Sequence, residues 1–181
     1  MKDYADLHTH TIASGHAYGT ITEMVHAAAL KDLPILGITE HAPSMPGSCG
    51  EMQFCNFNVI PPVLEGVRLL FGCELNIVDY SGTIDLSERM LKRLSYTVVS
   101  LHDLCLKPGT MEDNTFAVLT ALKNPYVTIL GHPDDGIYPL EYEPIVEAAK
   151  ETNTLLEVNN NSLNPAGSRK HTRENLIAML E

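Results

Sequence analysis

Short apolar runs recur along this chain, and longer stretches with a different periodicity separate them. Each run is rich in Val, Ile, Leu or aromatic residues and is only three to seven residues long, which is typical of buried strands. On this pattern we predict strands at Ala5–Leu7, Ile35–Ile38, Arg68–Glu74, Tyr96–Leu101, Tyr126–Gly131 and Thr154–Val158.

The stretches between these runs carry apolar residues at helical spacing. Thr22 and Ser87 each precede such a stretch in the position of a helix cap, and Asn114 or Thr115 does so for a third. A fourth stretch has Pro144 near its first turn, where proline is tolerated. The chain therefore alternates strands with helices.

This alternation predicts an α/β fold with a parallel sheet. No glycine-rich phosphate loop follows the first strand, so a closed barrel fits better than a dinucleotide-binding fold. Met45–Phe57 is expected to be a loop and Tyr80–Gly82 a tight turn. With 181 residues and no linker or repeat, residues 1–181 are interpreted as a single domain.

The composition of the chain excludes or disfavours several classes of protein and partner. Apolar residues make up 44% and charged residues 19%, as in a globular protein, and no apolar run is long enough to cross a bilayer. The N-terminal MKDYADLHTH lacks the apolar core of a signal peptide, so we expect a cytoplasmic protein. A net charge of −11 disfavours nucleic acid as a partner. The four cysteines form no C-x-x-C pair, which disfavours a thiolate zinc site.

Metal-capable side chains fall where the predicted strands end. In a barrel of parallel strands those ends gather on one face, which carries the chemistry. His8 and His10 form an H-x-H in which both imidazoles point the same way if the backbone is extended. The full set is His8, His10, His16, His41, Glu74, His102 and His132.

A single histidine at a strand end is more often structural than a ligand, and His26 and His171, which do not follow this rule, are assigned to surface or packing roles. The joint pattern, in contrast, indicates a metal centre. Imidazole and carboxylate are good ligands for zinc, iron and manganese, and the two oxygens of Glu74 could bridge two ions.

Several motifs together resemble the polymerase-and-histidinol-phosphatase (PHP) phosphoesterases, and within them the YcdX-like phosphatase branch. The motifs are DLHTH at 6–10, ASGHAY at 13–18, ITEH at 38–41, GCE at 72–74, SLHD at 100–103, GHPD at 131–134, EVNNNS at 157–162 and SRK at 168–170.

The resemblance implies a distorted barrel of seven strands and seven helices with up to three divalent metal ions. Zinc is the expected metal, with manganese or iron as alternatives. It implies a first ion held by His8, His10 and Glu74, a second by Glu74, His102 and His132, and a third by His16 and His41.

The family's remaining ligands lie in a D-x-H motif after the last strand, and the sequence ends at Glu181 without one. The first and third ions would each lack one ligand, and the barrel its last strand and helix. We therefore expect a PHP domain truncated at its C-terminus. Oligomeric state stays open, although an unpaired sheet edge gives such a chain a reason to form a homo-oligomer.

The implied function is hydrolysis of a small-molecule phosphomonoester by a metal-bound hydroxide. Glu74 and Arg169 are the candidate catalytic residues. The Arg169 guanidinium is suited to bind phosphate through two parallel hydrogen bonds. The alternative interpretation is that Arg169 is a solvent-exposed charge on a loop. Asp6, Asp103 and Asp134 flank ligands and are candidates to orient them.

Three other interpretations remain open. An amidohydrolase also uses H-x-H on a first barrel strand, but would cleave amides. A nuclease would use the PHP domain on nucleic acid, against which the acidic balance counts. A non-catalytic or partner-completed metal-binding module would bind metal without turnover, and the absent D-x-H favours it.

Overall fold

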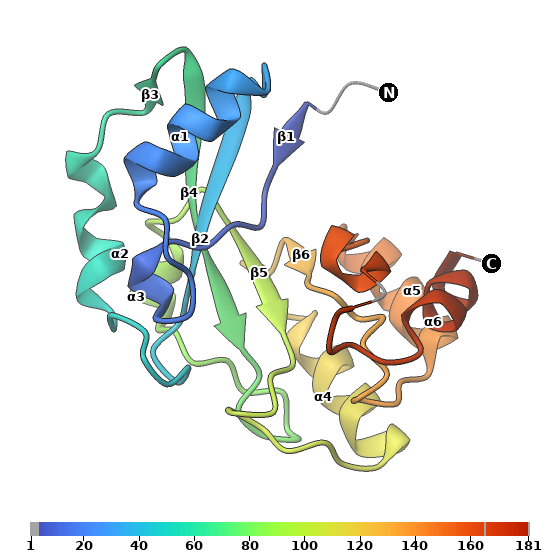
Figure 1. Ribbon diagram of the computed structural model, residues 1–181. Helices are drawn as coiled ribbons and strands as arrows, with labels where there is room; N and C mark the ends of the chain where they lie inside the picture. The colour runs from blue at the N-terminus through green and yellow to red at the C-terminus, as the bar shows by residue number, and fades with distance from the viewer. Residues whose placement is uncertain (1–3, 165, 181) are drawn as a thin grey trace. The chain divides into compact units, whose positions relative to one another are not determined.

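The computed structural model describes residues 4–164 and 166–180, which form two compact units (Figure 1). The first unit runs to Leu75 and includes Asp85–Val98. The second comprises Asn76–Ile84 and the chain from Val99 onward. The interpretation of residues 1–181 as a single domain stays a prediction.

The first unit is built on parallel strands. Strand β1 (Ala5–Asp6) pairs with β2 (Ile35–His41), and β2 pairs with β4 (Val67–Asn76). A short β3 (Val63–Leu64) forms an antiparallel hairpin with β4. Strand β5 (Tyr96–Ser100) begins beside β4, because Ser95 N donates to Phe71 O (2.8 Å). Its last residues belong to the second unit.

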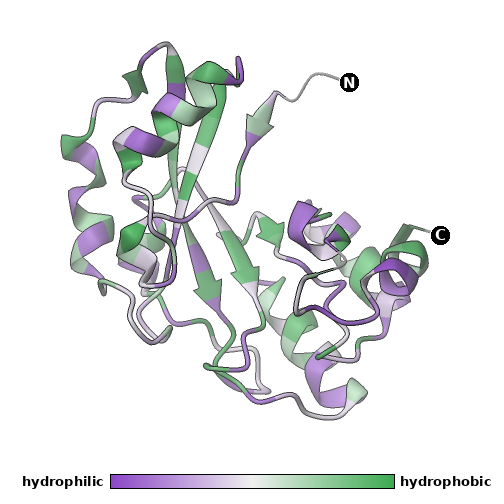
Figure 2. Cartoon of the chain, in the orientation of Figure 1, coloured by the Kyte–Doolittle hydropathy of each residue, from purple (hydrophilic) through white to green (hydrophobic). Residues whose placement is uncertain are grey.

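Helix α1 covers this sheet. Val25 and Ala28 on α1 pack against Leu36 and Ile38 of β2 and against β4, and all are buried. In Figure 2 strand β2 begins green and has paler segments further along, whereas α1 shows both hydrophobic and hydrophilic colours around its turns, as an amphipathic helix does. The helical segments of this unit are η1 (Ile12–Ser14), α1 (Ile21–Leu30), α2 (Met52–Asn56), η2 (Phe57–Val59) and α3 (Glu88–Leu91).

In the second unit, β5 is followed by two short parallel strands, β6 (Ile129–Leu130) and β7 (Leu155–Leu156). Gly131 N donates to Val99 O (2.9 Å), which places β6 next to the end of β5. Helix α5 contacts α4, α6 and β7, so the three helices form a row beside these strands. The helical segments are α4 (Met111–Ala121), α5 (Tyr142–Thr152), η3 (Asn160–Leu163) and α6 (Thr172–Leu180).

The predicted α/β class with parallel strands is confirmed, and several boundaries are wrong. Thr20, not Thr22, caps α1, because its hydroxyl accepts from Glu23 N while the Glu23 carboxylate accepts from Thr20 N. Thr110 caps α4 in the same way, so that helix begins earlier than the predicted Asn114 or Thr115. In both helices the reciprocal capping box, rather than the first apolar residue of the periodic pattern, determines where the helix begins.

Two further segments differ from expectation. The predicted loop Met45–Phe57 contains helix α2, and β3 was not predicted because two residues carry no periodicity. The turn at Tyr80–Gly82 is present, with Gly82 N donating to Asp79 O (3.1 Å). Among the residues that the structure describes, every helix is too short or too polar to span a bilayer.

Candidate metal centre

The first unit brings the H-x-H pair to Glu74. Strand β1 ends at Asp6, but the chain continues alongside β2, because Thr9 N donates to Thr39 Oγ1 (3.0 Å) and Thr39 N donates to Thr9 O (2.9 Å). Thr9 thereby holds an extended backbone, and residues on either side of it point the same way. His8 Nε2 and His10 Nε2 each lie 3.1 Å from a carboxylate oxygen of Glu74.

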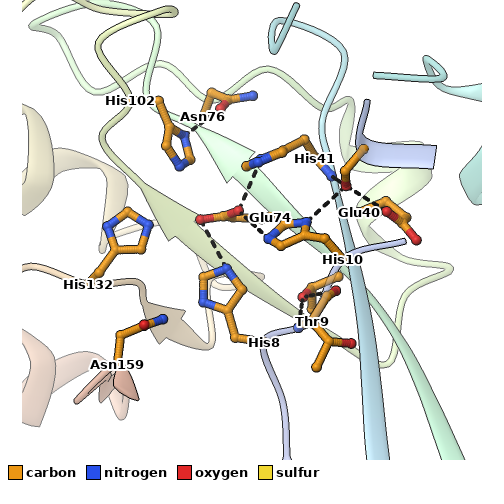
Figure 3. A network of polar contacts seen from close by, with 12 residues as sticks. His8, Thr9, His10, Glu40, His41, Glu74, Asn76, His102, His132 and Asn159 are labelled. Atoms are coloured by element: carbon orange, nitrogen blue, oxygen red, sulfur yellow. Dashed lines mark hydrogen bonds and ion pairs between the residues drawn. The ribbon is translucent and has the colours of Figure 1, made fainter. Parts of the chain in front are cut away.

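Strand register explains the third histidine. His41 is the direct partner of Glu74 in the parallel pairing of β2 with β4. Partners in adjacent strands lie on the same face of a sheet. His41 Nδ1 accordingly lies 3.0 Å from Glu74 Oε2, and both side chains are almost fully buried. Figure 3 shows the three imidazoles directed at the one carboxylate.

His16 joins the same group from a loop. Its ring centroid lies 5.0 Å from that of His10 and 4.8 Å from that of His41. The loop turns at Gly15, whose φ of 78° favours glycine and where a Cβ would lie 2.5 Å from Gly47 O. Candidate ligand atoms of His10, His16 and His41 all lie within 4.8 Å of one another, close enough to share an ion.

Electrostatics favour the neutral form of the His16 imidazole. Desolvation, and then the neighbouring His41 and His10, lower the pKa of His16 below its usual value. A lowered pKa leaves the ring unprotonated at neutral pH, with a lone pair available for a cation. The donor set of imidazole nitrogens around a buried carboxylate therefore fits a divalent ion of the zinc, iron or manganese type.

The second unit holds two more of the predicted ligands. His102 follows β5, and its Nδ1 lies 2.8 Å from Oδ1 of the buried Asn76. His132 follows β6, and its ring meets that of His102 edge to face with centroids 5.4 Å apart. His132 has a φ of 30°, rare for a residue with a side chain, and its backbone N donates to Glu157 Oε2 (2.6 Å).

Arg169, the predicted phosphate grip, is half-buried in the second unit, and its guanidinium donates to Ser162 Oγ (2.8 Å). Its approach to a substrate stays a prediction. Of the two histidines assigned to other roles, His26 is exposed on α1 with Nδ1 2.9 Å from Glu65 Oε2, and His171 is exposed.

Sequence reasoning missed the residues that orient the ligands. Asp6 accepts from the backbone N of His8, and both carboxylate oxygens of the buried Asp134 lack a hydrogen-bond partner among the described residues. Further polar contacts come from Ser14 and Asn76, beside the rings of His10 and His102, and from Glu157, which accepts the backbone N–H of His132. The orienting role of Asp6, Asp103 and Asp134 stays a prediction. The available signal was that polar residues interrupt buried strands or lie next to a ligand.

Comparison with known proteins agrees with this geometry. A family model described as "PHP domain" matches residues 6–163. A probable phosphatase of Caldicellulosiruptor saccharolyticus is 46% identical over 97% of this chain and 72% of its own length. Probable phosphatases of Clostridium novyi (48%) and Acetivibrio thermocellus (47%) match 90% and 97% of the chain, which spans 66% and 71% of their lengths.

A solved structure shares the fold. It is a histidinol phosphate phosphatase from Lactococcus lactis, complexed with zinc, L-histidinol and phosphate. The two superpose with a TM-score of 0.59 at 15% identity, over 98% of this chain and 81% of the other. The predicted fold type is thereby confirmed.

Proposed function

This chain belongs to the PHP domain family, and on that premise we propose that it is a metal-dependent phosphatase of a small-molecule phosphomonoester. The observation that carries the proposal is the convergence of three imidazoles on the buried Glu74 carboxylate, at 3.0 to 3.1 Å. The names of the relatives as probable phosphatases support the reaction class.

Each unit has its part in the proposal. In the first unit Glu74, His8, His10, His16 and His41 hold cations, and in the second His102 and His132 are cation ligands. When bound, divalent cations supply a hydroxide nucleophile at neutral pH and offset the negative charge of the phosphoryl oxygens. Zinc is the expected metal because imidazole and carboxylate suit it, and the solved relative contains it.

The role of Arg169 is to bind the phosphate group. A planar guanidinium matches phosphate oxygens bidentately, and Ser162 Oγ now accepts one of its hydrogens. Arg169→Met is expected to raise KM for a phosphate ester about tenfold or more, as for loss of a charge-assisted hydrogen bond, without changing metal content. Arg173→Met, at an exposed position of α6, is the matched control.

The main test combines metal content with turnover. His41→Ala is expected to lower hydrolysis of p-nitrophenyl phosphate more than about 100-fold, whereas His26→Ala, which removes an exposed histidine, leaves it unchanged. Parallel assays with an aryl amide and an oligonucleotide distinguish the rival hydrolases. Turnover of the amide alone would favour an amidohydrolase, and tight metal binding without turnover would favour a non-catalytic module.

A further inference from the structure

Glu40 is a buried carboxylate outside the predicted donor set. It lies on β2 next to His41, is 1% exposed, and has no cationic side chain among its hydrogen-bond partners in the described chain. Its oxygens accept from Thr11 Oγ1 (2.5 Å), Thr11 N (3.2 Å) and Ser14 Oγ (2.6 Å). Burying a charge is costly, so its position calls for a function.

Ser14 connects this carboxylate to the candidate metal ligands. Its Oγ lies 2.9 Å from His10 Nδ1 and receives the backbone N–H of His41 at 3.1 Å. A hydroxyl has one hydrogen to donate and two lone pairs to accept with. The Glu40 carboxylate can only accept, so the Ser14 hydrogen points to Glu40 and both lone pairs face His10 and His41.

The proton on His10 is thereby fixed. Because Ser14 must accept from His10, the hydrogen of the neutral ring lies on Nδ1 and the lone pair lies on Nε2. That nitrogen is the one 3.1 Å from Glu74 Oε2. Two acceptors that face each other at this distance leave a position suited to a cation.

We propose that Glu40 is a positioning residue that acts through Ser14 to hold His10 in the Nδ1–H tautomer, with Nε2 ready to bind a cation. This inference rests on the proposed metal function and adds to it the residues that set ligand geometry. Ser14 contacts the ring of His10 and the backbone N–H of His41, and the two rings stack with centroids 4.4 Å apart.

Zinc affinity measured by competition with a chromogenic chelator provides the test. Ser14→Ala is expected to weaken zinc binding about 10- to 100-fold and Glu40→Gln to weaken it less, since an amide accepts the Ser14 hydrogen more weakly. The double variant is expected to match Ser14→Ala alone, because Glu40 acts through the hydroxyl. Glu65→Gln, beside the exposed His26, is the control for the same chemical change.

A readout on the wild-type protein makes the test independent of variant folding. Long-range ¹H–¹⁵N spectra of the zinc-loaded protein should show His10 protonated at Nδ1 and coordinated through Nε2. Coordination through Nδ1, or effects of the two substitutions that simply add, would overturn the proposal. Zinc binding without phosphatase turnover would instead contradict the proposed function, and it would not contradict the positioning role of Glu40 and Ser14.

Discussion

The two units position their histidines in different ways. In the first, regular strand register places His41 opposite Glu74, and the chain that extends β1 delivers His8 and His10 to the same carboxylate. In the second, His102 follows the five-residue β5, whereas His132 follows β6, which is only two residues long, and has a left-handed backbone. His102 Nδ1 lies 2.8 Å from Asn76 Oδ1, and Glu157 accepts the backbone N–H of His132.

The contrast shows two ways in which this protein positions its candidate metal ligands. In the first unit, strand pairing brings three histidines to one carboxylate, and Ser14 contacts two of them together. In the second unit, His102 and His132 each have a polar partner of their own. Changes to the first unit should therefore affect several ligands together, and changes to the second should affect one ligand at a time.

Glu74→Gln should produce the largest effect. It removes the negative charge on which three imidazoles of the first unit converge. Zinc stoichiometry should fall and phosphatase activity should drop more than about 100-fold, beyond what loss of an outer partner causes. Metal analysis and aryl phosphate hydrolysis check this, and an active, fully loaded variant would show that the cluster does not depend on Glu74.

Gly37→Ala tests the strand framework of the first unit. A Cβ at this position of β2 would lie 1.9 Å from the Tyr96 hydroxyl and 2.9 Å from Leu7 Cα. It would displace the hydroxyl from its hydrogen bond to Leu7 O (2.7 Å). Urea denaturation should show a loss of about 1–3 kcal/mol in unfolding free energy. Gly19→Ala, where the nearest atom is 3.4 Å away, should change it by less than about 0.5 kcal/mol.

Glu157→Gln tests the individual support of the second unit. The carboxylate accepts the backbone N–H of His132 at 2.6 Å and also binds the Asn159 amide. Weakening this charge-assisted bond should lower kcat/KM about tenfold, while zinc binding by the first unit is retained. The control is Glu147→Gln, an exposed residue paired with Lys150. Equal losses in both variants would argue against specific support of His132.

The smallest effect concerns Asp79, in the turn before Gly82. Hydrogen bonds from Ser81 and Thr83 lower its pKa from near 3.8 to about 2. A carboxylate with a depressed folded-state pKa stabilises the fold above about pH 4, and this contribution disappears as the pH falls toward 2. Asp79→Asn should cost no more than about 0.5 kcal/mol at pH 7, allowing for solvent screening. Urea midpoints should converge with the wild type near pH 2, and a constant difference would contradict this assignment.

The sequence predicts those features that show as a periodic apolar pattern or as residue types typical of metal ligands. Buried strands such as Ile35–Ile38 show as apolar runs, and the H-x-H with Glu74 shows as ligand chemistry at strand ends. Helix starts at Thr20 and Thr110 were missed because the capping boxes lie ahead of the apolar repeat.

The orienting residues were missed for a different reason. Ser14 and Glu40 are far from Glu74 in the sequence, and only the folded chain shows that one hydroxyl serves both His10 and His41. The direction of a hydrogen bond depends on all partners of an atom together, and Glu40 and His41 lie more than twenty residues from Ser14 in the sequence. The role of Arg169 likewise depends on a substrate, which no residue pattern specifies.

The proposed function requires that the histidines of the first unit and Glu74 form a cation site. An anomalous difference map from crystals grown with excess zinc tests it most directly. We expect a peak about 2.0–2.2 Å from a Glu74 oxygen and from Nε2 of His8 or His10. A map with zinc bound elsewhere and no peak within bonding distance of Glu74 would contradict it.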